Sequence, residues 1–244
     1  MTAMDRYYGL LMGQMVKVRH TQWEKIDTAA RWLGESLSHD GWLYAFGTGH
    51  SHALAEEIFY RAGNPARATP MLDSRLMLHH EAIQATYNER EEGYGAKLLN
   101  SYPVQRGDVL IVVSNSGRNA VPIDVALEGR RLGLRVIAVT NLEQSRAWPS
   151  RHSGGKVLAD VADLTIDNCG VNGDACLELD GLPGKIGPTS TSTGALIVNA
   201  IIVQSLAYAL ESGHAPEIYI SSNTNGDDHN DLLLQKYKSK IRHL

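Results

Sequence analysis

Residues Trp42–Glu57, WLYAFGTGHSHALAEE, decide how the rest of the chain is organised. The stretch begins with strand-forming residues, continues through a Gly-x-Gly-x-Ser turn and ends in good helix formers. A helix that starts directly after such a turn binds anions, because its first N–H groups have no partner within the helix and its dipole favours negative charge there. The stretch therefore predicts a strand, an anion-binding loop and a helix.

The turn differs from the best-known nucleotide-binding loops. Gly47 and Gly49 let the chain turn and let a ligand approach the backbone, and Ser51 offers a hydroxyl. The third glycine of a dinucleotide fingerprint is missing, since His52 stands in its place, and no Gly-Lys-Ser/Thr follows as in a P-loop. We therefore expect a phosphate that is not part of a dinucleotide.

The composition is that of an ordinary globular protein. Of 244 residues, 43% are hydrophobic and 20% charged, and the formal net charge is −4, which makes nucleic acid and anionic membranes poor partners. No apolar run approaches ~20 residues, so no membrane span is expected, and no signal peptide is evident. Cys169 and Cys176 are the only cysteines and indicate a reducing, cytoplasmic location, with a disulfide or a metal pair as alternatives.

Strands alternate with helices along the chain. Beyond the first unit we expect strands at 66–70, 109–113, 134–140 and 162–166, which together predict a five-stranded, mostly parallel sheet with helices on both faces. We interpret residues 1–244 as a single domain: an N-terminal helical segment (1–38), a core (40–210) and a C-terminal tail (211–244). Residues 168–188 are rich in glycine and predict a long functional or mobile loop, followed by hydroxyl-rich residues 189–194 and an apolar helix at 195–210.

The N-terminal segment carries an apolar stripe with a period close to 3.6 residues. It predicts one long amphipathic helix, or two. The stripe includes Trp23 and Trp32, so the segment either packs on a partner subunit or covers the sheet.

A second turn, Ser114–Asn119 (SNSGRN), follows the apolar run at 109–113. Together with GTGHS at 47–51, it resembles the phosphosugar-binding loops of the sugar isomerase (SIS) domain family, which has an early Gly-x-Gly-x-Ser loop and a Ser-x-Ser-Gly-x-Thr/Asn loop. The resemblance covers about residues 40–210. It implies a three-layer, flavodoxin-like α/β sandwich, a phosphosugar ligand, no cofactor or metal, and a homodimer or larger homo-oligomer.

Carried over position by position, the resemblance implies a phosphosugar site built from hydroxyls and backbone N–H groups. Short donors that act together suit a dianion, and each charge-assisted bond contributes ~1.5–3 kcal/mol. The alternative is that these residues are only turn formers and helix caps. The residues are Gly49, His50, Ser51, Ser114, Asn115, Ser116, Gly117, Asn119, Thr191 and Ser192.

With GPTSTSTGALIVNAI at 187–201 and SSNTNGDDHND at 221–231, the whole chain resembles more closely a stand-alone bacterial branch of the family. That narrower resemblance implies a dehydratase acting on N-acetylglucosamine 6-phosphate, by proton abstraction at carbon 2 and loss of the 3-hydroxyl. An aldose–ketose isomerase needs the same equipment, namely an anchored phosphate, a base and an acid. A non-catalytic phosphosugar sensor is the third possibility, although the sequence shows no DNA-binding helix-turn-helix.

The candidate acids and bases lie close to the predicted loops. Glu81 is the first choice as base, because its segment follows the second predicted strand, where several members of the SIS family place functional residues, and apolar neighbours there would favour its role as a base. Glu56 also stabilises a helix dipole, and Arg61 occupies the position of the phosphoheptose isomerase base, which argues against that activity. The complete catalytic set is Glu81, Glu56, His79 and His80.

Histidines offer two further possibilities. His50, His52, His79 and His80 could converge on a metal, although no carboxylate or cysteine set completes the ligands and hydrogen bonding is the more common role. The tail histidines His214 and His229 either reach a site, across a dimer if need be, or lie in a solvated tail.

Overall fold

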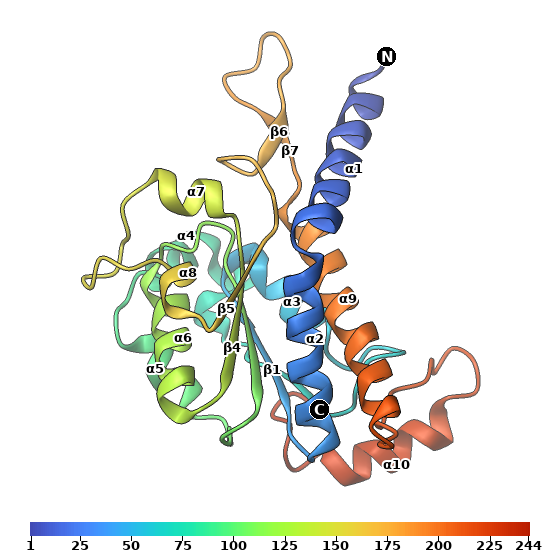
Figure 1. Ribbon diagram of the computed structural model, residues 1–244. Helices are drawn as coiled ribbons and strands as arrows, with labels where there is room; N and C mark the ends of the chain where they lie inside the picture. Colours follow the sequence, from blue (N-terminus) through green and yellow to red (C-terminus); the bar gives the residue numbers. More distant parts are fainter.

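A five-stranded parallel sheet forms the centre of the computed structural model, which covers residues 1–244 (Figure 1). The strand order is β2-β1-β3-β4-β5. This is the doubly wound order of flavodoxin-like folds, in which ligands bind at the carboxyl ends of the strands. The predicted fold class is confirmed, and the sheet is parallel throughout. The strands are β1 (Leu43–Gly47), β2 (Ala68–Pro70), β3 (Val109–Val113), β4 (Arg135–Thr140) and β5 (Leu164–Asp167).

Helices cover both faces of this sheet. Helices α2 (Trp23–Ser38) and α9 (Ser190–Glu211) pack on one face, whereas α5 (Tyr94–Leu99), α6 (Ala120–Leu132) and α8 (Leu158–Val161) pack on the other. The remaining elements are α1 (Ala3–Thr21), α3 (His52–Glu57), α4 (Leu78–Asn88), α7 (Leu142–Ala147), α10 (Asp227–Tyr237), β6 (Ala175–Leu177), β7 (Ile186–Pro188), and the 3-10 turns η1 (Gly49–Ser51) and η2 (Ser74–Leu76).

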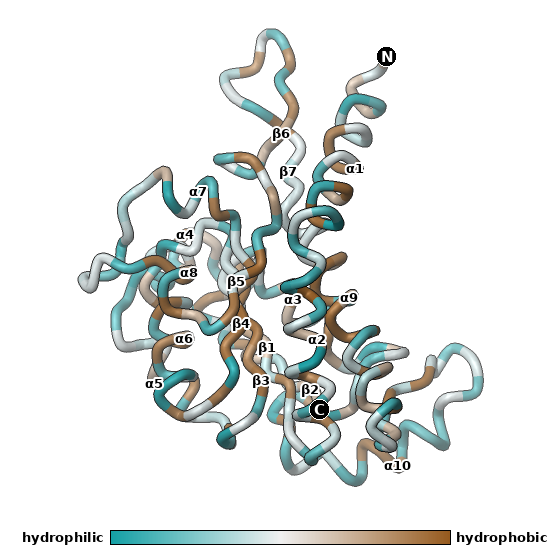
Figure 2. The backbone as a smooth tube through the Cα atoms, viewed as in Figure 1, coloured by the Kyte–Doolittle hydropathy of each residue, from teal (hydrophilic) through white to brown (hydrophobic).

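The apolar runs of the central strands supply both halves of the core. Along β1, Leu43 and Ala45 face the α2/α9 layer, while Tyr44 and Phe46 face the α6 layer, as the two-residue period of a strand requires. Every residue of β1 and β3 is buried. Figure 2 shows hydrophobic chain concentrated in these strands and in the helices against them. Burial on both faces explains why the strands are continuous apolar runs.

The N-terminal segment consists of two helices that meet at Gln22. Helix α2 covers the sheet with Ile26 and Leu33, in agreement with the covering role. Helix α1 buries only Gln14 and Val18 and extends beyond the sheet beside the β6–β7 hairpin (Figure 1).

The segment 168–188 differs from the predicted loop because it contains the β6–β7 hairpin. Helix α9 also begins at Ser190, earlier than predicted, so the hydroxyl-rich cluster lies within its first turns. Asp174 explains this start: its carboxylate accepts the N–H groups of Thr189 and Ser190 and the Ser190 hydroxyl. A carboxylate at this position caps the helix and complements its dipole.

Helix α9 is also longer than expected from the sequence. Its 22 residues would suffice to cross a membrane by length and mean hydropathy alone, although polar residues such as Asn199 and Gln204 interrupt its apolar sequence. Residues along its length, including Ile197, Ile201 and Ile202, are buried in the core against α2 and the sheet. The helix therefore has the contacts of a core helix.

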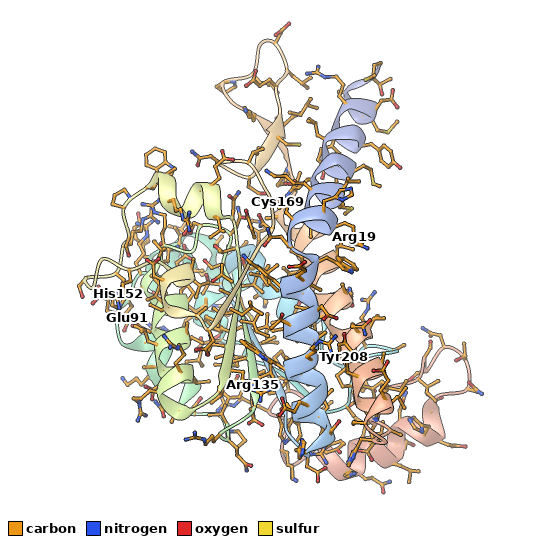
Figure 3. The ribbon with its side chains drawn as sticks, viewed as in Figure 1. Arg19, Glu91, Arg135, His152, Cys169 and Tyr208 are labelled. Atoms are coloured by element: carbon orange, nitrogen blue, oxygen red, sulfur yellow. The ribbon has the colours of Figure 1, made fainter.

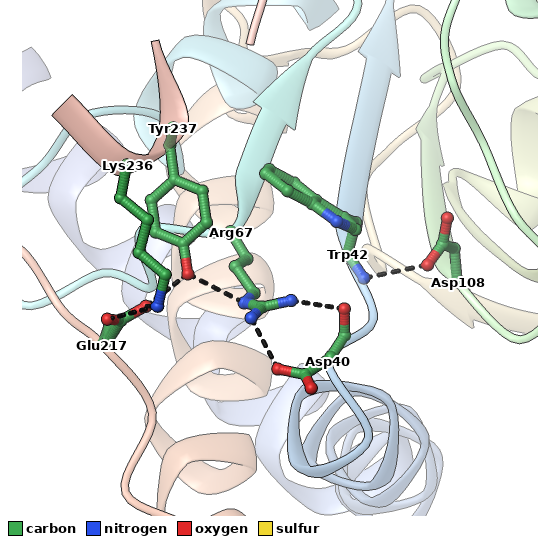
Figure 4. A network of polar contacts seen from close by, with 7 residues as sticks. All are labelled: Asp40, Trp42, Arg67, Asp108, Glu217, Lys236 and Tyr237. Carbon is green, nitrogen blue, oxygen red and sulfur yellow. Dashed lines mark hydrogen bonds and ion pairs between the residues drawn. The ribbon is translucent and has the colours of Figure 1, made fainter. Parts of the chain in front are cut away.

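The C-terminal tail folds back on the amino ends of the strands. Arg67, just before β2, donates from Nε to the Tyr237 hydroxyl (3.0 Å) and forms an ion pair with Asp40 (Figure 4). Lys236 of α10 pairs with Glu217 at 2.8 Å. Within one chain, the tail is thus fixed at the edge of the sheet opposite the predicted loops.

Candidate functional site

The Gly-x-Gly-x-Ser turn closes tightly after β1. A Cβ atom at Gly47 would lie 2.4 Å from the carbonyl oxygen of Ser51, and Gly49 has a positive φ of 56°, so the backbone itself requires glycine at both positions. The Ser51 hydroxyl is half-buried and has no hydrogen-bond partner within the protein, and the N–H groups of Gly49 and His50 are also unpaired. The turn therefore presents several free donors together.

The second turn leaves β3 at the same edge of the sheet. Strands β1 and β3 are neighbours, with Gly47 opposite Val113, so the two turns begin side by side as the sequence predicts. Ser114 accepts the Gly117 N–H at 3.2 Å. A Cβ at Gly117, whose φ is 62°, would lie 2.7 Å from the Thr140 hydroxyl, so this position too requires glycine.

This second turn forms a nest of unpaired backbone donors. The N–H groups of Asn115, Ser116, Arg118 and Asn119 have no acceptor within the chain, and neither has the half-buried Ser116 hydroxyl. Successive N–H groups that point into one concavity bind anions. The turn is therefore equipped for a phosphate independently of any resemblance.

One small pocket brings three of the predicted segments together. It is lined by Ser51 of the first turn, Asn115 of the second, and Ser190 and Thr191 at the start of α9. Asn168, directly after β5, lines it as well and donates to the Asn115 carboxamide oxygen at 2.7 Å. Sequence reasoning missed Asn168, although its place after a parallel strand could have indicated it.

The other predicted binding residues do not line this pocket. Gly49 belongs to the first turn, and Ser114, Ser116, Gly117 and Asn119 belong to the second. His50 is exposed on the first turn. Ser192 lines an apolar groove between α2 and α9 that includes Trp23 and Val203, and it does not line the pocket that contains Thr191. The expected roles of both residues remain predictions.

The predicted acids and bases lie on the helices around the first turn. Helix α4 packs on η1, and the His79 ring lies 5.8 Å from that of His52, whose Nδ1 contacts the Gly49 carbonyl. Glu81 interrupts α4 with an extended backbone and is exposed to solvent, not surrounded by apolar side chains as the sequence suggests. Glu56 and His80 are also exposed.

Glu89 is a carboxylate that the sequence did not single out. Its Oε2 accepts the Thr48 hydroxyl of the first turn at 2.7 Å, and its carbonyl oxygen accepts the N–H of Val121 in α6, the helix that follows the second turn. Glu89 is half-buried and bridges the two turns. Only the folded chain brings it there, because it stands far from both turns in sequence.

The segment 148–155 also lies against the second turn. Arg151 Nη1 donates to the Asn119 carboxamide oxygen at 3.0 Å. His152, labelled in Figure 3, pairs with Asp124 at 3.2 Å. Burial raises the pKa of Asp124, while hydrogen bonds from Gly93 and His152 oppose this increase. Burial and the charge of Arg151 both lower the pKa of Arg118.

Other chemistry suggested by the sequence has no geometric counterpart. No group of three or more histidine, cysteine or acidic side chains is arranged to hold a metal ion. Cys169, labelled in Figure 3, and Cys176 are both free thiols, and burial raises the pKa of each. His214 lines a pocket at the opposite edge, and His229 contacts the Ile218 carbonyl, so neither reaches the turns within one chain.

The sequence is similar to a known domain family and to bacterial proteins. The model of the SIS domain matches residues 6–141. A UPF0309 protein of Caldanaerobacter subterraneus is 41% identical over 99% of this chain and its own full length, and one of Halalkalibacterium halodurans is 44% identical over 87% of this chain and 86% of that protein.

Solved structures share the fold at low sequence identity. A phosphoheptose isomerase of Neisseria gonorrhoeae superposes with a TM-score of 0.52 and 16% identity, over 84% of this chain and 96% of that one. The Vibrio vulnificus NanR protein, complexed with ManNAc-6P, superposes with a TM-score of 0.51 and 15% identity, over 87% and 67%. At such identities the likeness concerns the fold.

Proposed function

The chain belongs to the SIS domain family, and on this premise we propose that it is an enzyme that processes phosphosugars, with N-acetylglucosamine 6-phosphate as substrate and dehydration as reaction. The observation that carries the proposal is that two donor-rich turns begin side by side at one end of the sheet, with Ser51, Asn115 and the start of α9 meeting at a small pocket. The unpaired donors of the turns are hydroxyls and backbone N–H groups, which suit a phosphate dianion.

The proposed reaction begins with the open-chain sugar held by its phosphate. A base takes the proton from carbon 2, and the electrons move into the carbon 1 carbonyl to give an enediol-type intermediate. Because carbon 2 carries nitrogen, return of a proton to form a ketose is hindered. The electrons instead return to form the carbon 2–carbon 3 double bond, the bond between carbon 3 and its hydroxyl breaks, and an acid supplies the proton that completes the leaving water.

Glu81 remains the proposed base and His79 a proposed acid, since both lie on α4, which packs on the first turn. Glu89 is a second candidate base, supported by its contact with Thr48 between the two glycines. An exposed carboxylate such as Glu81 could act once substrate covers it, whereas Glu89 is already half-buried.

The test is incubation of the protein with N-acetylglucosamine 6-phosphate, followed by mass spectrometry and ultraviolet absorbance. We expect loss of one water and a new absorbance from the unsaturated product. E81Q should abolish turnover and keep binding if Glu81 is the base, and E89Q should do so if Glu89 is. E143Q, at an exposed acid of α7, is the matched control.

The same assay separates the alternatives. A product of unchanged mass that is a ketose would identify an aldose–ketose isomerase, which uses the same anchored phosphate and base. Ligand binding without turnover, unaffected by either glutamate substitution, would identify a phosphosugar sensor. Absence of binding to any phosphosugar would contradict all three.

A further inference from the structure

The side chain of Asn119 is held in an unusual way for a residue that precedes a helix. An asparagine at this position normally accepts an N–H of the first helical turn with its side-chain oxygen. Asn119 makes no such bond at the start of α6. The Val121 N–H is taken by the Glu89 carbonyl, and the next residue, Pro122, has no N–H. Helix capping therefore does not explain why asparagine stands here.

The side-chain oxygen of Asn119 instead accepts a hydrogen bond from Arg151. Its Nη1 lies 3.0 Å from Asn119 Oδ1, and because a guanidinium can only donate, the atom facing it must be the carboxamide oxygen. The amide nitrogen then points away from Arg151, with both of its N–H bonds unused by the protein. Asn119 itself is buried and belongs to the turn whose backbone N–H groups are unpaired.

We propose that Arg151 is a positioning residue of the phosphate site: it fixes the orientation of the Asn119 carboxamide so that the site receives N–H donors and no acceptor. This inference rests on the proposed function. Without the arginine, the carboxamide could rotate by 180° and present its oxygen to the phosphate, which would repel it.

The segment around Arg151 is built to hold the guanidinium in place. The Arg151 N–H donates to the Arg118 carbonyl, and Arg118 Nε donates to the Pro149 carbonyl, so the segment is bound to the turn at its backbone. The neighbouring His152 Nδ1 accepts the Gly154 N–H, which leaves Nε2 to donate to Asp124. Arg151 forms no ion pair with a carboxylate, so no acidic side chain competes with the Asn119 oxygen for its guanidinium.

The test is a double-mutant cycle between Arg151 and Asn119, read as the dissociation constants of inorganic phosphate and of N-acetylglucosamine 6-phosphate by calorimetry. R151M should weaken both ligands about tenfold, and R151K, which keeps a donor, should recover part of the loss. N119T replaces the carboxamide by a hydroxyl that can donate in any rotamer. In that background, R151M should change affinity less than about twofold.

R146M is the matched control, because it removes the same charge from an exposed arginine without an ion pair at the same edge of the sheet. If R151M and R146M weaken ligand affinity equally, Arg151 acts only through its positive charge, and the inference is overturned. Equal weakening by R151M with and without N119T, which a merely structural role predicts, would overturn it as well. If the unaltered protein binds but the cycle shows no coupling, only this inference fails; if it binds neither ligand, the proposed function fails with it.

Discussion

The amino ends and the carboxyl ends of the strands, here called the amino edge and the carboxyl edge of the sheet, both carry polar groups. These groups differ in whether they find partners within the protein. At the amino edge, Arg67, Asp40, Glu217, Lys236 and Tyr237 find their partners in one another (Figure 4). At the carboxyl edge, the turns after β1 and β3 present hydroxyls and backbone N–H groups with no partner in the chain. Groups that satisfy one another hold the fold together, whereas groups left unsatisfied indicate a ligand.

The difference has an energetic basis. An unpaired donor costs free energy when water cannot reach it, about 1–3 kcal/mol, so a fold collects such donors at one place only where something offsets the cost. Three glycines at the carboxyl edge, Gly47, Gly49 and Gly117, keep the backbone close enough to expose those donors. We therefore expect substitutions at the carboxyl edge to affect binding and those at the amino edge to affect stability.

The largest expected effect is the loss of binding in the double variant S51A/S116A. These hydroxyls have no partner within the protein, so their removal should leave the free energy of unfolding nearly unchanged. Each would otherwise donate to the phosphate, and two such bonds contribute at least ~3 kcal/mol, which corresponds to more than about 100-fold in affinity. Calorimetry with N-acetylglucosamine 6-phosphate and thermal unfolding measure the two quantities.

S239A removes an exposed hydroxyl beyond α10, at the amino edge, and serves as the control. It should change neither quantity. A double variant that loses stability and keeps its affinity would reverse the proposed assignment of the two edges.

R67M should have a smaller effect, on stability and not on binding. The substitution leaves Asp40 and the Tyr237 hydroxyl without the donor that joins them, and should destabilise the protein by about 2 kcal/mol in denaturant unfolding. Phosphosugar affinity should stay within twofold. R31M breaks an exposed ion pair with Asp27 and should cost less than about 1 kcal/mol. Equal losses in the two variants would show that the Arg67 network is no more than a surface contact.

Most of the fold can be predicted from the sequence because its signals are local. The run Val109–Val113 is apolar at every position, as a strand buried on both faces must be, and the turn after it contains its own glycine and serines. The early start of α9 could not be predicted, because it depends on Asp174, which reaches Ser190 from another segment. Arg151 and Glu89 were missed for the same reason: each contacts a turn that only the folded chain brings near it.

The smallest expected effect concerns the pH dependence of the amino edge. Burial raises the pKa of Glu217, but hydrogen bonds from Lys236 and Tyr237 outweigh burial and lower it below its ordinary value of 4.5. A carboxyl group with a depressed pKa stabilises the fold above its unfolded-state pKa, and this contribution is lost as the pH falls through the folded-state value. The free energy of unfolding should therefore decline below about pH 5, and it should decline less in E217Q. The difference should stay under about 1 kcal/mol because the pair is partly exposed.

Denaturant unfolding between pH 7 and pH 3 measures this difference. The same decline in E217Q as in the unaltered protein would show that Glu217 does not contribute to the loss of stability in acid. Affinity for the phosphosugar at pH 7 should be the same in both proteins, since this ion pair lies at the edge of the sheet that holds the tail and not at the edge that binds the ligand.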